Sequence, residues 1–323
     1  MLNREKSPYI SCVVPAYNEA DNIAEFIKTL HQQLAQLSDR FEIIVVDDCS
    51  SDQTAATVLA IADQYRVKLM SFSRNFGKEI ALSAGIDHAA GDVVVMIDAD
   101  FQHPVEIIPE FLAQWRAGYD MVYGAQRNRE YMSPLRRTSS ESFYYLMSKL
   151  SNIKLQADAG DFRLMDRKVA DALKAMPERN RFMKGLYAWV GFKTVGVPYD
   201  VHPRHAGTSR FNLRSLTSLA LSGIVSFSTI PLRIWGLIGF IVAAISLCYA
   251  LFIVTRTLIF GIDLPGWATL VVAVTFLGGL QLLSVGILGE YISNIFNEVK
   301  QRPRYLIAHK HGFTDTPPSH TKP

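Results

Sequence analysis

The chain has 323 residues, of which 49% are hydrophobic and 20% charged, with a formal net charge of +3 and a mean hydropathy of +0.12. A chain this apolar buries enough surface to offset its conformational entropy, which excludes an intrinsically disordered protein. Its three cysteines include no Cys-x-x-Cys pair, which excludes a disulfide framework and argues against a structural zinc site.

The first 126 residues alternate short apolar runs with stretches of helical periodicity. The runs predict strands at 9–14, 41–46, 67–72, 92–97 and 120–123. The periodic stretches predict helices from residue 23 to about 30 and at 54–65, 79–89 and 105–115. Apolar strands that alternate with amphipathic helices predict an α/β domain, Rossmann-like, with a mostly parallel sheet and helices on both of its faces.

Polar clusters follow all five predicted strands. Ligands of such sheets bind beyond the carboxyl ends of the strands, so clusters at several neighbouring ends predict one shared site. The clusters are Pro15 to Glu19, Asp47 and Asp48 with Ser50, Ser51 and Asp52 behind them, Ser73 to Lys78, Asp98 to Pro104, and Gly124 to Arg127.

The most informative cluster holds Asp98 and Asp100. Two carboxylates one residue apart after a buried strand can both reach a hard cation, so we expect Mg²⁺ or Mn²⁺ there, sharing phosphate oxygens. Such a pair arises by chance about once in a chain of this size, and a solvated turn or a helix N-cap is the alternative. Asp47, Asp48 and Glu19 on neighbouring strand ends favour the metal, because so many acids repel one another without a cation or donor between them.

Hydrophobicity is concentrated near the C-terminus. Between Ile234 and Gly289 only Arg256 and Asp263 are charged, and each of the two uncharged runs is long enough to cross a bilayer as a helix. We therefore expect two transmembrane helices, at about 234–255 and 266–288; a pair of buried core helices is the alternative. Glycine and alanine residues in both runs favour close helix packing in lipid.

The charge pattern predicts the orientation of these helices. Arg233 precedes the first run and four basic residues between 300 and 310 follow the second, so the positive-inside rule places both ends in the cytoplasm. Residues 1–229 carry 26 Lys and Arg against 26 Asp and Glu, whereas the remainder carries 7 against 4. Because the head has no net basic charge, we expect no nucleic-acid partner.

The strand-end motifs resemble family 2 inverting glycosyltransferases, which have the glycosyltransferase A fold. The resemblance rests on Pro15-Ala-Tyr-Asn-Glu19, Val45-Val-Asp-Asp48, Asp98-Ala-Asp100-x-Gln102-x-Pro104 and Gly160-Asp-Phe-Arg163. Within the family the similarity is greatest to polyprenyl-phosphate glycosyltransferases, and more narrowly to bacterial bactoprenol glucosyl transferases. Segments that support this narrower group are Arg74 to Glu79, Met176 to Asn180, Arg181 to Gly185, Ser226 to Trp235, Leu277 to Gln281 and Leu288 to Tyr291.

The resemblance implies a role for each strand-end residue. The nucleotide sugar would be held by Pro15, Tyr17, Asn18, Glu19, Asp47, Asp48, Lys78, Asp98 and Ala99, and the metal by Asp98, Asp100 and Gln102. The catalytic residues would be Asp161, at the position of the catalytic base, and Asp100. A lipid monophosphate is already largely a dianion at pH 7, which leaves three other roles open for Asp161: positioning the acceptor, holding sugar hydroxyls, or a structural turn.

An acceptor phosphate needs cationic partners. The candidates are Arg127, Arg204, Ser209 and Arg210, the last three in a segment that matches the family's Arg-x-x-Gly-x-Ser loop. Arg129, Arg136 and Arg137 are further candidates, and a basic collar attracted to anionic lipid is the alternative for all these arginines. Apolar faces within 143–150 and 213–224 predict helices that lie along the membrane interface, or that pack on the sheet or on a neighbouring subunit.

These observations predict four parts: a cytosolic glycosyltransferase domain at 1–211, an interfacial amphipathic helix at 212–231, two transmembrane helices within 232–289, and a cytoplasmic tail at 290–323. The resemblance implies a multi-pass enzyme of a bacterial inner membrane that transfers a hexose, with glucose favoured, from a UDP-sugar to undecaprenyl phosphate with inversion. The β-linked product would serve modification of a surface glycan such as lipopolysaccharide O-antigen. A homo-oligomer (a tetramer by resemblance), a lipid-sugar flippase and a downstream membrane glycosyltransferase would be its partners.

Three alternatives remain open from the sequence. Two are enzymes, a dolichyl-type or polyprenyl-phosphate synthase that uses GDP-mannose and a synthase that uses a UDP-aminosugar. The third is a non-catalytic, membrane-anchored sensor of nucleotide sugars, against which the intact set of Asp98, Asp100 and Asp161 argues.

Overall fold

The computed structural model describes residues 4–127, 159–179, 181–200, 230–260 and 266–313. The chain forms two compact units, and each is described here by itself. The first comprises residues 1–145, 154–212 and 303–323, and the second comprises 146–153 and 213–302. Several predicted features lie outside the described residues: both interfacial apolar faces, Arg129, Arg136, Arg137, Arg204, Ser209 and Arg210.

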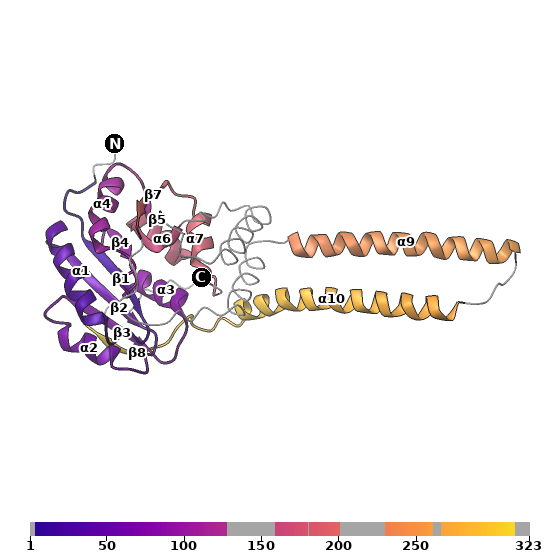
Figure 1. The fold of residues 1–323 in the computed structure, drawn as a ribbon, viewed down its shortest axis with the longest axis horizontal. Helices are drawn as coiled ribbons and strands as arrows, with labels where there is room; N and C mark the ends of the chain where they lie inside the picture. The colour runs from indigo at the N-terminus through magenta and orange to yellow at the C-terminus, as the bar shows by residue number, and fades with distance from the viewer. Residues whose placement is uncertain (1–3, 128–158, 180, 201–229, 261–265, 314–323) are drawn as a thin grey trace. The chain divides into compact units, whose positions relative to one another are not determined.

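An eight-stranded sheet forms the centre of the first unit, in the order β7-β5-β6-β4-β1-β2-β3-β8 (Figure 1). The strands are β1 (Ile10–Ala16), β2 (Phe41–Asp47), β3 (Val67–Phe72), β4 (Val93–Met96), β5 (Met121–Gln126), β6 (Ala159–Asp166), β7 (Thr194–Tyr199) and β8 (Ile307–His311). Strands β4, β1, β2 and β3 are parallel, and β5 is parallel to β7. The other three pairings are antiparallel: β6 with β4 and with β5, and β8 with β3. The predicted α/β fold with a mostly parallel sheet is confirmed.

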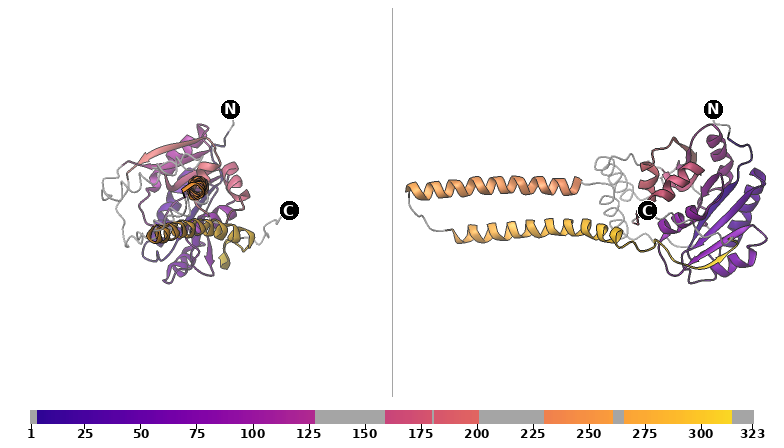
Figure 2. Two further views of the ribbon diagram at one scale, coloured as in Figure 1. Left: turned by 90° about the vertical axis from the view of Figure 1, so that its right-hand side faces the viewer. Right: turned by 180° about the vertical axis from the view of Figure 1, so that it is seen from behind.

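Helices cover both faces of this sheet (Figure 2). They are α1 (Ile23–Leu37), α2 (Thr54–Ile61), α3 (Lys78–His88), α4 (Ile108–Arg116) after a 3₁₀ turn at Val105–Ile107, α6 (Arg167–Ala175) and α7 (Met183–Trp189). Alternate residues of β1 serve opposite faces, because side chains of a strand point alternately up and down. Cys12 and Val14 join the core formed with α1 and α4, whereas Val13 faces α3.

Helix α3 lies unusually close to strand β1. A Cβ atom on Gly85 would lie 2.1 Å from Val13 Cγ1, so only glycine allows this separation. The helix begins at Lys78, directly after Gly77, whose φ of +96° is strained for a residue with a side chain. The docking of α3 therefore determines where Lys78 lies.

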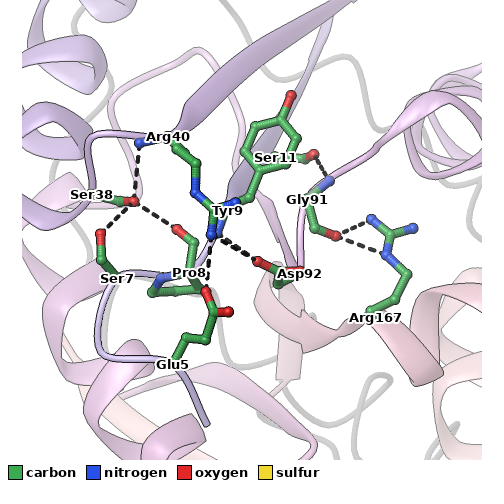
Figure 3. A network of polar contacts seen from close by, with 10 residues as sticks. All are labelled: Glu5, Ser7, Pro8, Tyr9, Ser11, Ser38, Arg40, Gly91, Asp92 and Arg167. Atoms are coloured by element: carbon green, nitrogen blue, oxygen red, sulfur yellow. Dashed lines mark hydrogen bonds and ion pairs between the residues drawn. The ribbon is translucent and has the colours of Figure 1, made fainter.

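The loops at the amino ends of the central strands bind one another (Figure 3). Gly91 N donates to Ser11 Oγ at 2.7 Å, and Gly91 O accepts from Arg167 Nε at 2.7 Å. Tyr9 N donates to Asp92 Oδ2 at 2.8 Å. These contacts satisfy the polar groups of this edge locally.

The segment after the second predicted membrane helix is more structured than the tail predicted for 290–323. Helix α10 continues to Val299, and β8 pairs with β3 at the edge of the sheet. Just before β8, Tyr305 stacks on Phe72 with ring centroids 5.3 Å apart, and its hydroxyl donates to Asp87 Oδ2 at 3.1 Å. The prediction missed this strand because its sequence, Ile-Ala-His-Lys-His, carries little hydrophobicity.

The second unit contains the long helices α9 (Ile230–Phe260) and α10 (Trp267–Val299). Within the described residues, one segment, Val272–Val299, is long and apolar enough to cross a membrane. The apolar stretch of α9, Ile234–Tyr249, is shorter. The number of membrane spans therefore stays a prediction.

Candidate active site

Acidic residues from β2, β4 and β6 lie at the same edge of the sheet, with β1 between β2 and β4. Asp47 ends β2, and Asp98 follows β4 by two residues. Strand β6 runs antiparallel to β4, with Met96 opposite Arg163, so continuing this register by two residues places Asp161 across from Asp98. Asp161 thus reaches the carboxyl edge of the parallel strands from the beginning of its own strand.

A lysine joins two of these carboxylates. Lys78 Nζ lies 2.7 Å from Asp98 Oδ2 and 3.1 Å from Asp161 Oδ2. Burial acts to lower the pKa of Lys78, but the two carboxylates outweigh it and hold the pKa above its ordinary value. The ammonium group is therefore charged at neutral pH and lies between the two predicted functional acids.

Asp161 is ionised at neutral pH. Burial acts to raise its pKa, but the positive charges of Lys78, Lys184 and Arg163 together hold the pKa well below its usual range. Its Oδ1 is buried and has no hydrogen-bond donor among the described residues. A buried acceptor without a donor costs about 1–3 kcal/mol, so a hydroxyl of a bound ligand would find a partner here.

The loop after β4 presents Asp98 and Asp100. Phe101 adopts a φ of +58° and packs on Phe26, which turns the chain back after the two acids. Gln102 N donates to Asp100 Oδ1 at 3.1 Å. Among the described residues, no three or more side chains of His, Cys, Asp and Glu gather into a complete metal site. Proteins nevertheless often bind Mg²⁺ through only one or two carboxylates, because phosphate oxygens of the ligand and water provide its other coordinating atoms.

Asp48 holds the loop that precedes Lys78. It is 4% exposed, and its Oδ1 and Oδ2 accept from Phe76 N at 2.6 Å and Gly77 N at 2.8 Å. Burial raises the pKa of this carboxyl, and the two N–H groups oppose the shift. In this structure Asp48 positions Lys78, and its contact with a nucleotide stays a prediction.

The turns after β1 and β2 are tied together by short polar contacts. Asn18, at a φ of +56°, donates from its N to Ser50 Oγ at 2.9 Å, and its Oδ1 accepts from Ser51 N at 2.8 Å. Asp47 Oδ1 accepts from Ser50 N at 3.0 Å. The structure thus brings the predicted residues of the first two strand ends into one network.

The other predicted residues that the structure describes lie at the end of β1 or follow β1, β4 and β5. Pro15 falls within β1, Tyr17 follows the strand with 37% of its surface exposed, and Glu19 N donates to Thr54 Oγ1 at 2.8 Å. Ala99, which stands between Asp98 and Asp100 in the sequence, is buried. Arg127 follows β5 with an exposed side chain, while its N donates to Tyr199 O at 2.9 Å.

The sequence analysis missed one carboxylate near Asp161. Glu79 Oε2 accepts from Met183 N at 2.9 Å, which joins the start of α3 to the start of α7. Burial and, after it, the charge of Asp161 raise the pKa of Glu79 to about 7. Glu79 and Met183 fall in two segments that supported the resemblance to bactoprenol glucosyl transferases, Arg74 to Glu79 and Arg181 to Gly185. Their place in these segments was the only signal in the sequence that could have pointed to them.

Comparison with known proteins identifies the family of the chain. Residues 11–174 match Glycosyl transferase family 2. The chain is 47% identical over 304 residues to an SfII prophage-derived bactoprenol glucosyl transferase of Shigella flexneri, covering 94% of this chain and 98% of that one. It is 46% identical over 300 residues to the uncharacterized glycosyltransferase sll0501 of Synechocystis, covering 93% and 94%. It is also 41% identical over 303 residues to the putative glycosyltransferase CsbB of Bacillus subtilis, covering 94% and 92%.

A mostly parallel sheet with helices on both faces and acids at its carboxyl edge defines the class as α/β proteins whose ligands bind at that edge. The chain belongs to glycosyl transferase family 2. The family and the group expected from the sequence motifs are both confirmed.

Proposed function

We propose that the protein transfers glucose from UDP-glucose to undecaprenyl phosphate with inversion. The observation that carries the proposal is the cluster of Lys78, Asp98 and Asp161 at the carboxyl edge of the sheet. Bactoprenol glucosyl transferases match this chain at 46–47% identity over nearly their whole length, which supports glucose as the sugar and the polyprenyl phosphate as the acceptor.

The donor would lie across the ends of β1, β2 and β4. The turns at Pro15 to Glu19 and at Asp47 and Asp48 would hold the nucleotide, with Ala99 and Lys78 near its diphosphate. The hard oxygens of Asp98 and Asp100, with Gln102 beside them, fit Mg²⁺ or Mn²⁺. Such a cation would stabilise the negative charge that develops on the departing UDP.

The acceptor would approach from the side of Asp161. A phosphate oxygen attacks the anomeric carbon in one displacement while the bond to UDP breaks, which inverts the configuration and gives a β-linked lipid-phosphate glucose. The Oδ1 of Asp161, which has no donor among the described residues, would accept a hydrogen bond from a hydroxyl of the sugar. Arg127, with Arg204, Ser209 and Arg210, would bind the acceptor phosphate.

The membrane arrangement is part of the proposal. The apolar segment 272–299 supports membrane association, and the uncharged run 234–255 would provide a second span. With two spans, the catalytic domain at 1–211 and the tail lie on the cytoplasmic side of a bacterial inner membrane, with 212–231 at the interface. A homotetramer, a flippase and a downstream transferase would complete the pathway.

A donor panel tests this proposal. Purified protein is incubated with undecaprenyl phosphate and radiolabelled UDP-glucose, a UDP-aminosugar or GDP-mannose, and the lipid is extracted. We expect label in the lipid from UDP-glucose and its loss with EDTA or in Asp100→Ala. Label from GDP-mannose alone would refute the donor assignment, no label from any donor would favour the sensor, and full activity with EDTA would refute the metal.

A further inference from the structure

A buried arginine lies beside Asp161 on the same strand. Arg163 is two residues further along β6, so the two side chains leave the same face of the sheet. It is 2% exposed and heads the largest fully buried side chains of the described residues. Its Nη2 donates to the carbonyl oxygen of Gly160 at 2.6 Å, and Gly160 directly precedes Asp161.

Helix α7 fixes the conformation of this arginine. The guanidinium carbon lies 3.6 Å from the ring centroid of Tyr187, a distance at which a cation is attracted to the face of an aromatic ring. Arg163 Nη1 lies 3.3 Å from Met121 Sδ on β5, and the Tyr187 hydroxyl lies 3.4 Å from Met96 Sδ on β4. The guanidinium is therefore held between a helix and the sheet.

The partners of Arg163 make a purely structural role a poor explanation. Among the described residues they are a carbonyl, a sulfur and an aromatic ring, not a carboxylate, and its buried Nε has no partner. A buried cation without a paired anion is costly, and apolar residues of similar volume usually stabilise a core better. The anion closest along the strand is Asp161, whose pKa is lowered in part by Arg163.

We propose that Arg163, held in place by Tyr187, is a positioning residue for Asp161 during glycosyl transfer. Its hydrogen bond fixes the backbone of Gly160, and its charge keeps the carboxylate of Asp161 in place across from Asp98. The inference rests on the proposed function. Arg163 is too deeply buried to touch the donor, so its loss lowers kcat and leaves the KM for UDP-glucose nearly unchanged.

Arginine 167 offers a matched control. Its Nε donates to Gly91 O at 2.7 Å (Figure 3). It thus holds a glycine carbonyl as Arg163 does, but at the other end of β6. The variants Arg163→Met, Arg163→Lys, Tyr187→Leu, Tyr187→Phe and Arg167→Met are compared as full chains. Thermal unfolding is measured for each, with kcat and the KM for UDP-glucose in transfer to undecaprenyl phosphate.

We expect Arg163→Met and Tyr187→Leu to lower kcat by about 10- to 100-fold, the range that follows when a catalytic group moves by about 1 Å. The KM for UDP-glucose should stay within about twofold. Arg163→Lys should recover part of kcat, and Tyr187→Phe, which keeps the ring face, should retain most of it. Arg167→Met should keep the wild-type kcat.

Equal kcat in Arg163→Met and the wild type would overturn the proposal, and so would an equal loss in Arg167→Met. If Arg163→Met does not fold, Tyr187→Leu tests the proposal in its place. A kcat equal to that of the wild type in Tyr187→Leu would also overturn the positioning role of Arg163. A wild type that transfers no sugar from any donor would refute the proposed function and this inference with it. An active wild type beside a fully active Arg163→Met would refute the positioning role alone.

Discussion

Replacing Gly85 by alanine tests whether the docking of α3 on β1 places Lys78. The new Cβ would lie 2.1 Å from Val13 Cγ1, 3.0 Å from Cγ2 and 3.1 Å from Cβ. Carbon atoms normally stay about 3.5–4.0 Å apart, so the helix must move away from the strand by more than 1 Å. Lys78 lies at the start of the same helix, so its ammonium would shift relative to Asp98 and Asp161.

The size of the effect follows from two opposing contributions. Overpacking a core costs about 1–3 kcal/mol, whereas alanine in place of glycine within a helix gains about 1 kcal/mol. We therefore expect a net loss of about 0–2 kcal/mol in Gly85→Ala. In a Val13→Ala background the two clashing methyl groups are absent and the remaining Cβ contact at 3.1 Å needs only a small shift, so the same change should stabilise the protein by up to about 1 kcal/mol.

The assay is a double-mutant cycle on the full chain, with thermal unfolding and kcat measured for all four proteins. The coupling energy between Gly85→Ala and Val13→Ala should be about 1–3 kcal/mol. In a domain of 150–250 residues each kcal/mol shifts the unfolding temperature by roughly 2–4 °C. Transfer activity should fall in Gly85→Ala and recover in the double variant. A coupling below about 0.5 kcal/mol, the level found for sites that do not interact, would show that the close contact of Gly85 with Val13 does not fix the position of α3.

Three further predictions concern Asp48 and Glu79 next to the site, and Asp87, which binds the chain before β8. Asp48→Asn leaves one backbone N–H of the loop without an acceptor, so we expect a loss of about 1–3 kcal/mol and a lower kcat, measured by thermal unfolding and steady-state kinetics. The pKa of Glu79, raised to about 7, means that the folded protein binds this proton more tightly than the unfolded chain, so its contribution to stability is lost as the pH rises through about 7. The unfolding temperature of Glu79→Gln relative to the wild type should therefore rise between about pH 5 and pH 8. Asp87→Ala removes the acceptor of the Tyr305 hydroxyl, so limited proteolysis between 300 and 306 should become faster.

Each of these predictions has an outcome that contradicts it. An unfolding temperature and a kcat equal to those of the wild type in Asp48→Asn would show that the loop before Lys78 is held without Asp48. Parallel pH profiles of the wild type and Glu79→Gln would show that Glu79 is ionised in both the folded and unfolded states. Unchanged proteolysis in Asp87→Ala would show that the chain before β8 is held without Tyr305.

The strands and helices up to residue 126 could be predicted because their apolar periodicity is a local property of the sequence. Strand β6 was missed because Gly160 and Asp161 follow its first residue and it contains the charged Arg163, so it lacks an apolar run. Strand β7 contains Gly196 and Pro198, both of which are unusual within strands. These strands form because the neighbouring strands accept their backbone hydrogen bonds, which no short window of sequence reveals.

The same distinction applies to the site. Asp98 and Asp100 could be predicted because they directly follow a buried strand. The ion pair between Lys78 and Asp161 could not, because it depends on the antiparallel direction of β6 and on the close docking of α3. The hydrogen bonds of Asp48 were equally out of reach, since its partner loop lies 28 residues further along the chain.

The most direct test of the account is the stereochemistry and rate of glucose transfer by the wild type and by Asp161→Asn. The full chain is incubated with UDP-[¹³C]glucose, undecaprenyl phosphate and Mg²⁺, and the lipid product is followed by NMR. We expect a β-linked glucosyl phosphate from the wild type and a rate at least about 100-fold lower from Asp161→Asn. An α-linked product, or a variant as fast as the wild type, would contradict this expectation.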